Sequence, residues 1–238
     1  LHQCIKRMRD GEKTETSDET KAVAAYYKVL NNMLSVFDLE KLYIPPQQDD
    51  AKGLYGNQLL CEQALLKELN LKDPESSHLL DMGCGRGRIA HYLASMTGGQ
   101  VSGYNIDPNQ IENAENWADE TNMSDRLHFK VGDHHDPLDY DSEIFDGCFS
   151  IQAVWPFFKK EELDSCAEEM YRVLKPGGYV FVTVPFNEIL EENEVICPNC
   201  GDKFHRWGHY SSFDKNKLNL LVTSYCITDR IALNYRCR

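Results

Sequence analysis

Along the middle of this chain, short apolar runs alternate with segments in which apolar residues are spaced at helical intervals. Short, largely apolar runs recur at 78–81, 100–105, 127–131, 146–152 and 179–184. Between these runs, apolar residues return every three or four positions, over 86–95, 109–120 and 160–173. The runs predict buried strands, and the spaced positions predict amphipathic helices. Because strands and helices alternate, we expect an α/β fold with helices on both faces of a parallel sheet.

The N-terminal third of the chain lacks strand patterns. Helical periodicity runs over 21–42 and again over 57–70, and Pro45-Pro46 interrupts it between them. These segments predict an N-terminal helical cap over residues 1–75.

Residues 76–238 carry the α/β pattern to the end of the chain. A stretch at 186–212 breaks the alternation and predicts a lid inserted after the fifth strand. A helix at 214–222 and two strands at 225–228 and 231–235 then complete the pattern. We therefore expect a Rossmann-like, mostly parallel seven-stranded sheet.

Composition narrows the classes of partner. The 238 residues include 25 basic and 38 acidic side chains, a net charge of −13. This balance argues against nucleic acid and anionic membrane surfaces as partners. No apolar run is long enough to cross a bilayer. Most of the nine cysteines are scattered through apolar segments, so Cys84, Cys148 and Cys166 are expected as small buried side chains in a reducing, cytoplasmic setting.

A glycine-rich turn follows the first predicted strand. The sequence Asp81-Met82-Gly83-Cys84-Gly85-Arg86-Gly87 ends an apolar run, and a helical pattern follows it. Glycines at alternate positions allow unusual backbone dihedrals and close approach of a ligand to a helix N-terminus. A dinucleotide fingerprint would place its third glycine at Arg88, so the spacing disfavours a nicotinamide enzyme. An acid before the turn suits an ammonium group better than a diphosphate.

The turn resembles motif I of the class I methyltransferases that use S-adenosylmethionine. Gly132-Asp133-His134 after the third predicted strand and Leu174-Lys175-Pro176-Gly177-Gly178 before the fifth are further matches. The resemblance covers about residues 76–186. It implies methyl transfer from S-adenosylmethionine, with the cofactor at the carboxyl ends of the strands.

Within that class, the chain is similar to the sterol C-methyltransferase and cyclopropane-synthase-like (type 11) branch of small-molecule enzymes. Tyr26-Tyr27 in a leading helix, Asn105 followed by Gln110, and the segment from Arg172 to Gly178 carry this similarity. Two features depart from the branch. Gln152 stands where the branch has glutamate, and its C-terminal sterol-binding part has no counterpart in this sequence.

The resemblance implies which residues contact the cofactor. They are Asp81, Gly83, Cys84, Gly85, Asn105, Ile106, Gln110, Gly132, Asp133, His134 and Gln152. Asp81 and the glycine backbone would hold the methionine part, Asn105 the ribose hydroxyls and Asp133 the adenine amino group. Asn105 replaces the usual acid and so gives up a charge-assisted hydrogen bond. Asp107 is an alternative ribose ligand, but capping of the next helix is the favoured role for it.

Candidate catalytic residues are fewer. A carbon or oxygen acceptor can need a general base within hydrogen-bond reach, and the candidates are His134 and His135 after the third strand and Tyr26, Tyr27 and Tyr55 in the expected cap. The alternatives are an adenine-side contact for His134 and ordinary helix packing for Tyr26 and Tyr27. The segment Trp155-Pro156-Phe157-Phe158 either lines an apolar substrate pocket or packs between a loop and a helix.

A possible metal site lies within the expected lid. Cys197 and Cys200 form a Cys-x-x-Cys pair, and His205 and His209 follow at a spacing of one helical turn. Two thiolates and two imidazoles suit a structural zinc ion. The alternative is a metal-free lid with reduced cysteines.

These observations predict an S-adenosylmethionine-dependent methyltransferase that acts on a small, largely apolar molecule, with no nucleic-acid partner. One alternative is a protein or nucleic-acid methyltransferase. The other is a non-catalytic binding module that keeps the cofactor fold and uses 197–209 as an interaction surface. The sequence leaves the acceptor atom and the oligomeric state open.

Overall fold

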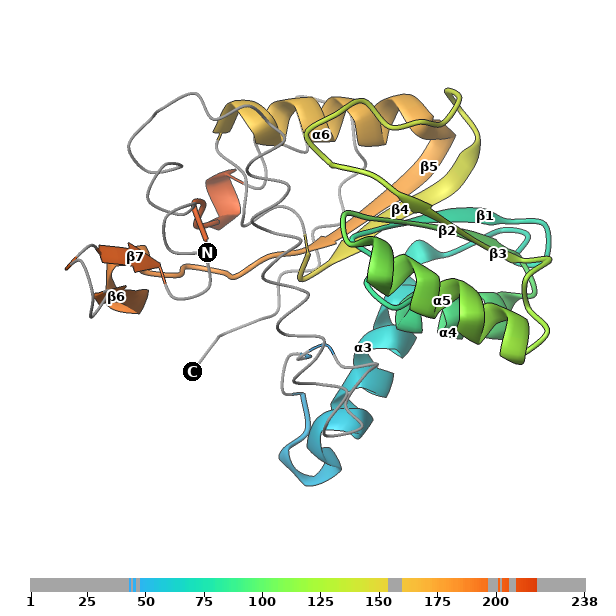
Figure 1. Cartoon of the computed structure of the whole chain (residues 1–238), viewed down its shortest axis with the longest axis horizontal. Coiled ribbons are helices and arrows are strands. Elements are labelled where there is room, and N and C mark those ends of the chain that lie inside the picture. The colour runs from blue at the N-terminus through green and yellow to red at the C-terminus, as the bar shows by residue number, and fades with distance from the viewer. Residues whose placement is uncertain are drawn as a thin grey trace.

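A computed structural model describes residues 48–153, 160–196 and 209–217, together with 43, 45, 201 and 203–205. Five parallel strands form its main sheet, in the order β3-β2-β1-β4-β5 (Figure 1). The strands are β1 (His78–Met82), β2 (Gln100–Asn105), β3 (Leu127–Val131), β4 (Phe145–Ile151) and β5 (Leu174–Thr183). Because all five run the same way, their carboxyl ends share one edge of the sheet.

Helices cover both faces of this sheet, as the alternation predicted. One face carries α3 (Gly53–Leu69), α4 (Arg88–Thr97) and α5 (Pro108–Glu120) (Figure 1). The opposite face carries α6 (Lys160–Val173). Two apolar cores result: one cluster holds side chains of α3, α4 and α5, and the other holds those of α6. Cys84, Cys148 and Cys166 are buried in these clusters, which confirms that they are small buried side chains.

Local sequence signals set several element boundaries. The Asp107 carboxylate accepts a hydrogen bond from the main-chain N–H of Asn109 (2.9 Å), and Pro108 takes the first helical position of α5. This is the capping role that the sequence favoured. Gly87 and Gly98, with φ of 77° and 76°, bound α4 in the left-handed conformation that glycine adopts without strain.

The fifth strand differs from its prediction. The sequence placed a sharp turn at 174–178 and the strand at 179–184, whereas β5 begins at Leu174. Leu174 pairs with Phe145, and the register shifts before Gly147 pairs with Tyr179. The predicted turn is therefore an irregularity inside the strand, where Gly177 adopts a φ of 81°.

Other predicted elements fall outside the described residues. They are the helix at 21–42, most of the helix at 214–222 and the strands at 225–228 and 231–235. The expected count of seven strands stays a prediction. The described residues show five strands in the main sheet.

The segment after β5 forms a small structure of its own. It contains a 3-10 helix, η3 (Leu190–Asn193), and an antiparallel pair, β6 (Glu194–Ile196) and β7 (Lys203–His205). Its two ends meet, because Phe186 and Phe213 form a parallel bridge and the Asn187 N–H donates to the Phe213 carbonyl (2.8 Å). The segment extends from the carboxyl end of β5 (Figure 1), but whether it covers a binding site stays a prediction.

Within the range predicted as a cap, the structure describes α3 and the short 3-10 helix η1 (Asp50–Lys52) before it, and the cap itself stays a prediction. Across the portion of the chain that the structure describes, none of the helices has the length and apolar character that crossing a bilayer requires.

Candidate functional site

The glycine-rich turn is a tight cradle between β1 and α4. The main-chain N–H groups of Gly83 and Cys84 donate to the Tyr104 carbonyl (2.8 and 3.3 Å), which ties the turn to the end of β2. Gly83, Gly85 and Gly87 have φ values of 81°, 54° and 77°. A side chain would be strained at each of these positions, so the three alternating glycines are required by the backbone path itself.

Asp81, the last acid before this turn, is a buried carboxylate. Its side chain is 2 % exposed, and its Oδ2 has no hydrogen-bond partner among the described residues. The main-chain N–H of Ala90 donates to the carboxylate, but burial dominates and raises the pKa of Asp81 to about 8. A buried carboxyl group of this kind gains most from a cationic ligand, which would supply the missing partner.

The end of β2 lies beside the turn and carries a linked pair of amides. Asn105 Nδ2 donates to Gln110 Oε1 (2.8 Å), and both side chains are more than nine-tenths buried. Gln110 also faces the turn, because a Cβ added at Gly85 would lie 3.9 Å from Gln110 Oε1. The structure thus brings together residues that the resemblance assigned to one ligand, and Ile106 follows Asn105 directly.

The end of β3 completes this side of the edge. The Gly132 N–H donates to the Asn105 carbonyl (2.9 Å), and a side chain at Gly132 would overlap the Tyr104 ring. The Asp133 carboxylate accepts from the main-chain N–H of His135 (3.0 Å) and lies 2.6 Å from its Nδ1. These contacts with His135 fix the orientation of the Asp133 carboxylate. It is a hydrogen-bond acceptor at the end of β3, two strands away from the glycine turn after β1.

His134 is present at this edge as a neutral imidazole. Burial lowers its pKa to about 4, against an opposing effect of Asp133, and its Nδ1 is buried without a hydrogen-bond partner among the described residues. A base with a pKa so far below neutrality accepts protons weakly. This environment favours the alternative that the sequence left open, a contact on the cofactor side.

Gln152 follows β4 in a strained conformation. Its φ of 53° lies in the left-handed region, which a non-glycine residue rarely adopts. The Gln152 N–H donates to the Thr183 Oγ1 (2.8 Å), and Thr183 is 6 % exposed at the end of β5. Sequence reasoning missed Thr183, because a threonine ending an apolar strand carries no signal of this anchoring role.

A buried ion pair fixes the helix that begins at the turn. Arg88 Nε lies 2.7 Å from Glu62 Oε1, and Glu62 on α3 is 2 % exposed. Burial raises the pKa of Glu62, and the hydrogen bond from Arg88 opposes that rise. This pair joins the N-terminal cap to the first residue of α4, a link that the sequence did not suggest.

Two predicted groups cannot be placed. Tyr26, Tyr27 and the aromatic segment 155–158 lie outside the described residues, so their catalytic and substrate-binding roles stay predictions. Cys197 and Cys200 also lie outside them.

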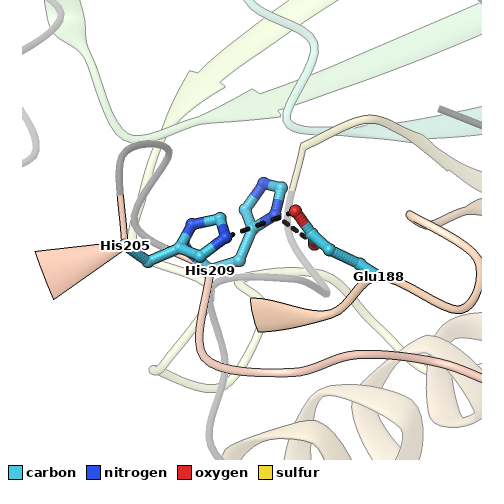
Figure 2. A group of neighbouring side chains, drawn as sticks. All are labelled: Glu188, His205 and His209. Carbon is cyan, nitrogen blue, oxygen red and sulfur yellow. Dashed lines mark hydrogen bonds and ion pairs between the residues drawn. The ribbon is translucent and has the colours of Figure 1, made fainter. Parts of the chain in front are cut away.

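The two predicted metal-binding histidines are brought together by the structure. The rings of His205 and His209 stack with centroids 4.8 Å apart, and both face the carboxylate of Glu188 (Figure 2). Sequence reasoning missed Glu188, because it is one of several acids between 188 and 194 and nothing in their spacing distinguishes it.

Comparison with known proteins fits this site. Residues 79–178 match a family model described as a methyltransferase domain. The chain is 29 % identical over 175 residues to the sterol 24-C-methyltransferase ERG6 of Saccharomyces cerevisiae, covering 71 % of this chain and 43 % of that protein. The chain thus spans less than half the length of that relative.

Solved structures share the fold. The [4+2]-cyclase SpnF superposes with a TM-score of 0.68 at 24 % identity, over 87 % of this chain and 72 % of that one. A second structure is the geranyl diphosphate C-methyltransferase from Streptomyces coelicolor, in complex with Mg²⁺, geranyl diphosphate and S-adenosyl-L-homocysteine. Its TM-score is 0.56 at 16 % identity, over 76 % of this chain and 70 % of that one.

The fold, the glycine turn with its buried acid and the matched methyltransferase domain are those of the class I methyltransferases that depend on S-adenosylmethionine. Within this class, the chain is similar to the sterol C-methyltransferases of the sterol- and cyclopropane-synthase-like branch. The nicotinamide-enzyme alternative is thereby set aside.

Proposed function

We propose that this chain transfers the methyl group of S-adenosylmethionine to a small, largely apolar molecule by in-line displacement. The observation that carries the cofactor assignment is Asp81 Oδ2, which has no partner in the part of the chain that the structure describes and lies beside three left-handed glycines. A buried carboxylate with one oxygen unpartnered among the described residues, next to a turn of glycines, fits the cationic amino-acid end of this cofactor. When bound, S-adenosylmethionine supplies a methyl group that its sulfonium centre already activates.

The residues of the chain then have separate tasks. Asp81 and the backbone of Gly83 to Gly85 hold the amino-acid end. Asn105 and Gln110 present an amide pair to the ribose hydroxyls, and Asp133 accepts from the adenine amino group. Because the methyl group is already activated, these residues contribute mainly by fixing position and excluding water.

Gln152 is the residue that we assign to the side of the reacting methyl. The Thr183 hydroxyl holds its backbone in the left-handed region at the carboxyl end of β4. Strain that the surrounding structure maintains in this way is common where a side chain must be aimed at a ligand. In this proposal the neutral His134 contacts the cofactor. Where the substrate requires a proton acceptor, Tyr26 or Tyr27 is the proposed one.

The apolar substrate class rests on similarity. A sequence relative is named for sterols and a solved structure of the same fold is named for geranyl diphosphate, and each of these molecules carries a hydrocarbon part. The net charge of −13 disfavours nucleic acid as the substrate. A cyclase also shares the fold, so methyl transfer has to be measured directly.

The test is transfer of an isotopically labelled methyl group. The purified chain is incubated with labelled S-adenosylmethionine and apolar probes, a Δ24-sterol and geranyl diphosphate among them, and product is detected by chromatography with mass spectrometry. We expect a singly methylated product that is lost in Asp81→Asn and retained in Asp125→Asn, which changes a carboxylate that is 75 % exposed. Cofactor binding without product from any apolar or protein acceptor would favour the non-catalytic module instead.

A further inference from the structure

The cluster of Glu188, His205 and His209 is a compact set of donor atoms outside the cofactor site. His209 Nδ1 lies 2.7 Å from Glu188 Oε2, and His205 Nε2 lies 3.3 Å from Glu188 Oε1. The three side chains are only 8 % to 14 % exposed. Figure 2 shows both imidazoles turned toward the one carboxylate. Buried ionisable groups that converge in this way require either a shared proton or a metal ion.

The spacing of these atoms suits a metal ion. One donor atom from each residue lies within 4.8 Å of the others. A tetrahedral zinc ion with bonds of about 2.1 Å separates its ligand atoms by about 3.4 Å, a value that lies between the 2.7 Å separation of His209 Nδ1 from Glu188 Oε2 and the 4.8 Å limit of the set. Two imidazoles and a carboxylate are ligands that zinc accepts readily. Small side-chain rotations would bring the three atoms to the required separation.

The surroundings support the carboxylate. Asn193 Nδ2 donates to Glu188 Oε1 (3.1 Å), and the Ser212 hydroxyl donates to the Glu188 carbonyl (2.6 Å). Outer contacts of this kind orient metal ligands before the metal binds. Glu188 is thereby held by Asn193 at the end of η3 and by Ser212 at the end of the segment after β5.

One contact opposes metal binding and has to be weighed. The main-chain N–H of His209 donates to His205 Nδ1 (3.2 Å). If the His205 ring is neutral, its proton is therefore on Nε2, which faces Glu188. Ligation through Nε2 moves that proton to Nδ1 and costs this one long hydrogen bond. A single neutral hydrogen bond contributes far less than the binding of a structural zinc ion.

We propose that Glu188, His205 and His209 bind a zinc ion that cross-links the two limbs of the segment after β5. Glu188 lies near its start, and the histidines lie at the end of β7 and just beyond. The bridge between Phe186 and Phe213 closes the base of the same segment. A zinc ion would therefore fix the shape of the segment that follows the catalytic sheet.

The test is a titration of the metal-stripped full chain with Zn²⁺, followed by calorimetry and elemental analysis. We expect one zinc ion per chain that survives gel filtration, and a loss of affinity of about 100-fold or more in His205→Ala and His209→Ala. Glu188→Gln keeps the size of the side chain and removes its charge, and should weaken binding in the same direction. His128→Ala is the matched control, because it removes an exposed histidine from β3 at the opposite edge of the sheet.

Two results would overturn the proposal. One is failure of the wild-type chain to retain zinc, and the other is retention by the histidine variants with loss only in Cys197→Ser with Cys200→Ser. Circular dichroism verifies that each variant is folded, and Glu188→Gln keeps the test valid should an alanine variant fail to fold. The readout requires no S-adenosylmethionine, so it succeeds or fails independently of the proposed methyl transfer.

Discussion

Replacing Asp81 by asparagine should stabilise the protein and weaken its cofactor binding at the same time. Burial raises the pKa of Asp81 to about 8 in the folded chain, against 3.8 as its ordinary value. At pH 7 the folded state therefore binds a proton that the unfolded state lacks. The free-energy cost is 1.36 kcal/mol for each of the roughly 3.2 units between pH 7 and 3.8, or about 4 kcal/mol as an upper bound. Asparagine has no such cost and can keep the hydrogen bond from the Ala90 N–H.

The raised pKa of Asp81 also determines how the stability of the protein changes with pH. Between about pH 4 and pH 8 the native state holds one more proton at Asp81 than the unfolded state, so the free energy of unfolding falls as pH rises, by up to about 1.4 kcal/mol per unit. Urea unfolding of wild type and Asp81→Asn across this range measures the slope. The variant should be the more stable at pH 7, with this component of the slope removed. A less stable variant, or the same slope in both proteins, would refute the reasoning.

Proton release on cofactor binding is a second test of the protonation state of Asp81. A cationic ligand that pairs with the Asp81 carboxylate should release about 0.9 proton at pH 7, the protonated fraction for a pKa of about 8. Calorimetry in buffers of different ionisation enthalpy counts that proton. The affinity of Asp81→Asn should fall roughly 10- to 100-fold, since it loses a charge-assisted hydrogen bond. Unchanged affinity would show that Asp81 is not the ligand.

Three further predictions follow from the supports of the site. Arg88→Met should lower the free energy of unfolding by about 3 kcal/mol because it leaves the Glu62 carboxylate buried and unpaired, and adding Glu62→Gln should recover most of the loss in chemical denaturation. Gly103→Ala should cost roughly 1–3 kcal/mol and weaken S-adenosylmethionine binding, because its Cβ would lie 2.7 Å from Phe129 Cε1; thermal melts that match wild type would contradict this. Asn105→Asp should tighten cofactor binding up to about tenfold in a titration, since it restores a charge-assisted bond to the ribose, and weaker binding would show that the amide pair is required.

Sequence reasoning succeeded where local signals act over a few residues. Asp107 and Pro108 set the start of α5 through a cap and a fixed φ, and both are readable in order along the chain. The alternating glycines after Asp81 likewise predicted the turn that the structure shows. The order of strands and helices was sufficient for a parallel sheet with two covered faces.

The features that sequence reasoning missed depend on contacts between distant segments. Glu62 meets Arg88 from a separate helix, and nothing in either local pattern indicates the pairing. Thr183 reaches Gln152 only because β4 and β5 are neighbours in the sheet. Glu188 meets His205 and His209 because the segment after β5 folds back on itself, so an acid that looked like one of many became the centre of a cluster. The raised pKa of Asp81 similarly depends on its burial in the folded structure.

The central claim is that the glycine turn and Asp81 bind S-adenosylmethionine. Calorimetric titration of the purified chain with S-adenosylmethionine, and separately with NADH, tests it most directly. The account predicts saturable binding of one S-adenosylmethionine per chain, weakened in Asp81→Asn and kept in Asp125→Asn, with no binding of NADH. Absence of S-adenosylmethionine binding, or equal binding by both variants, would contradict it.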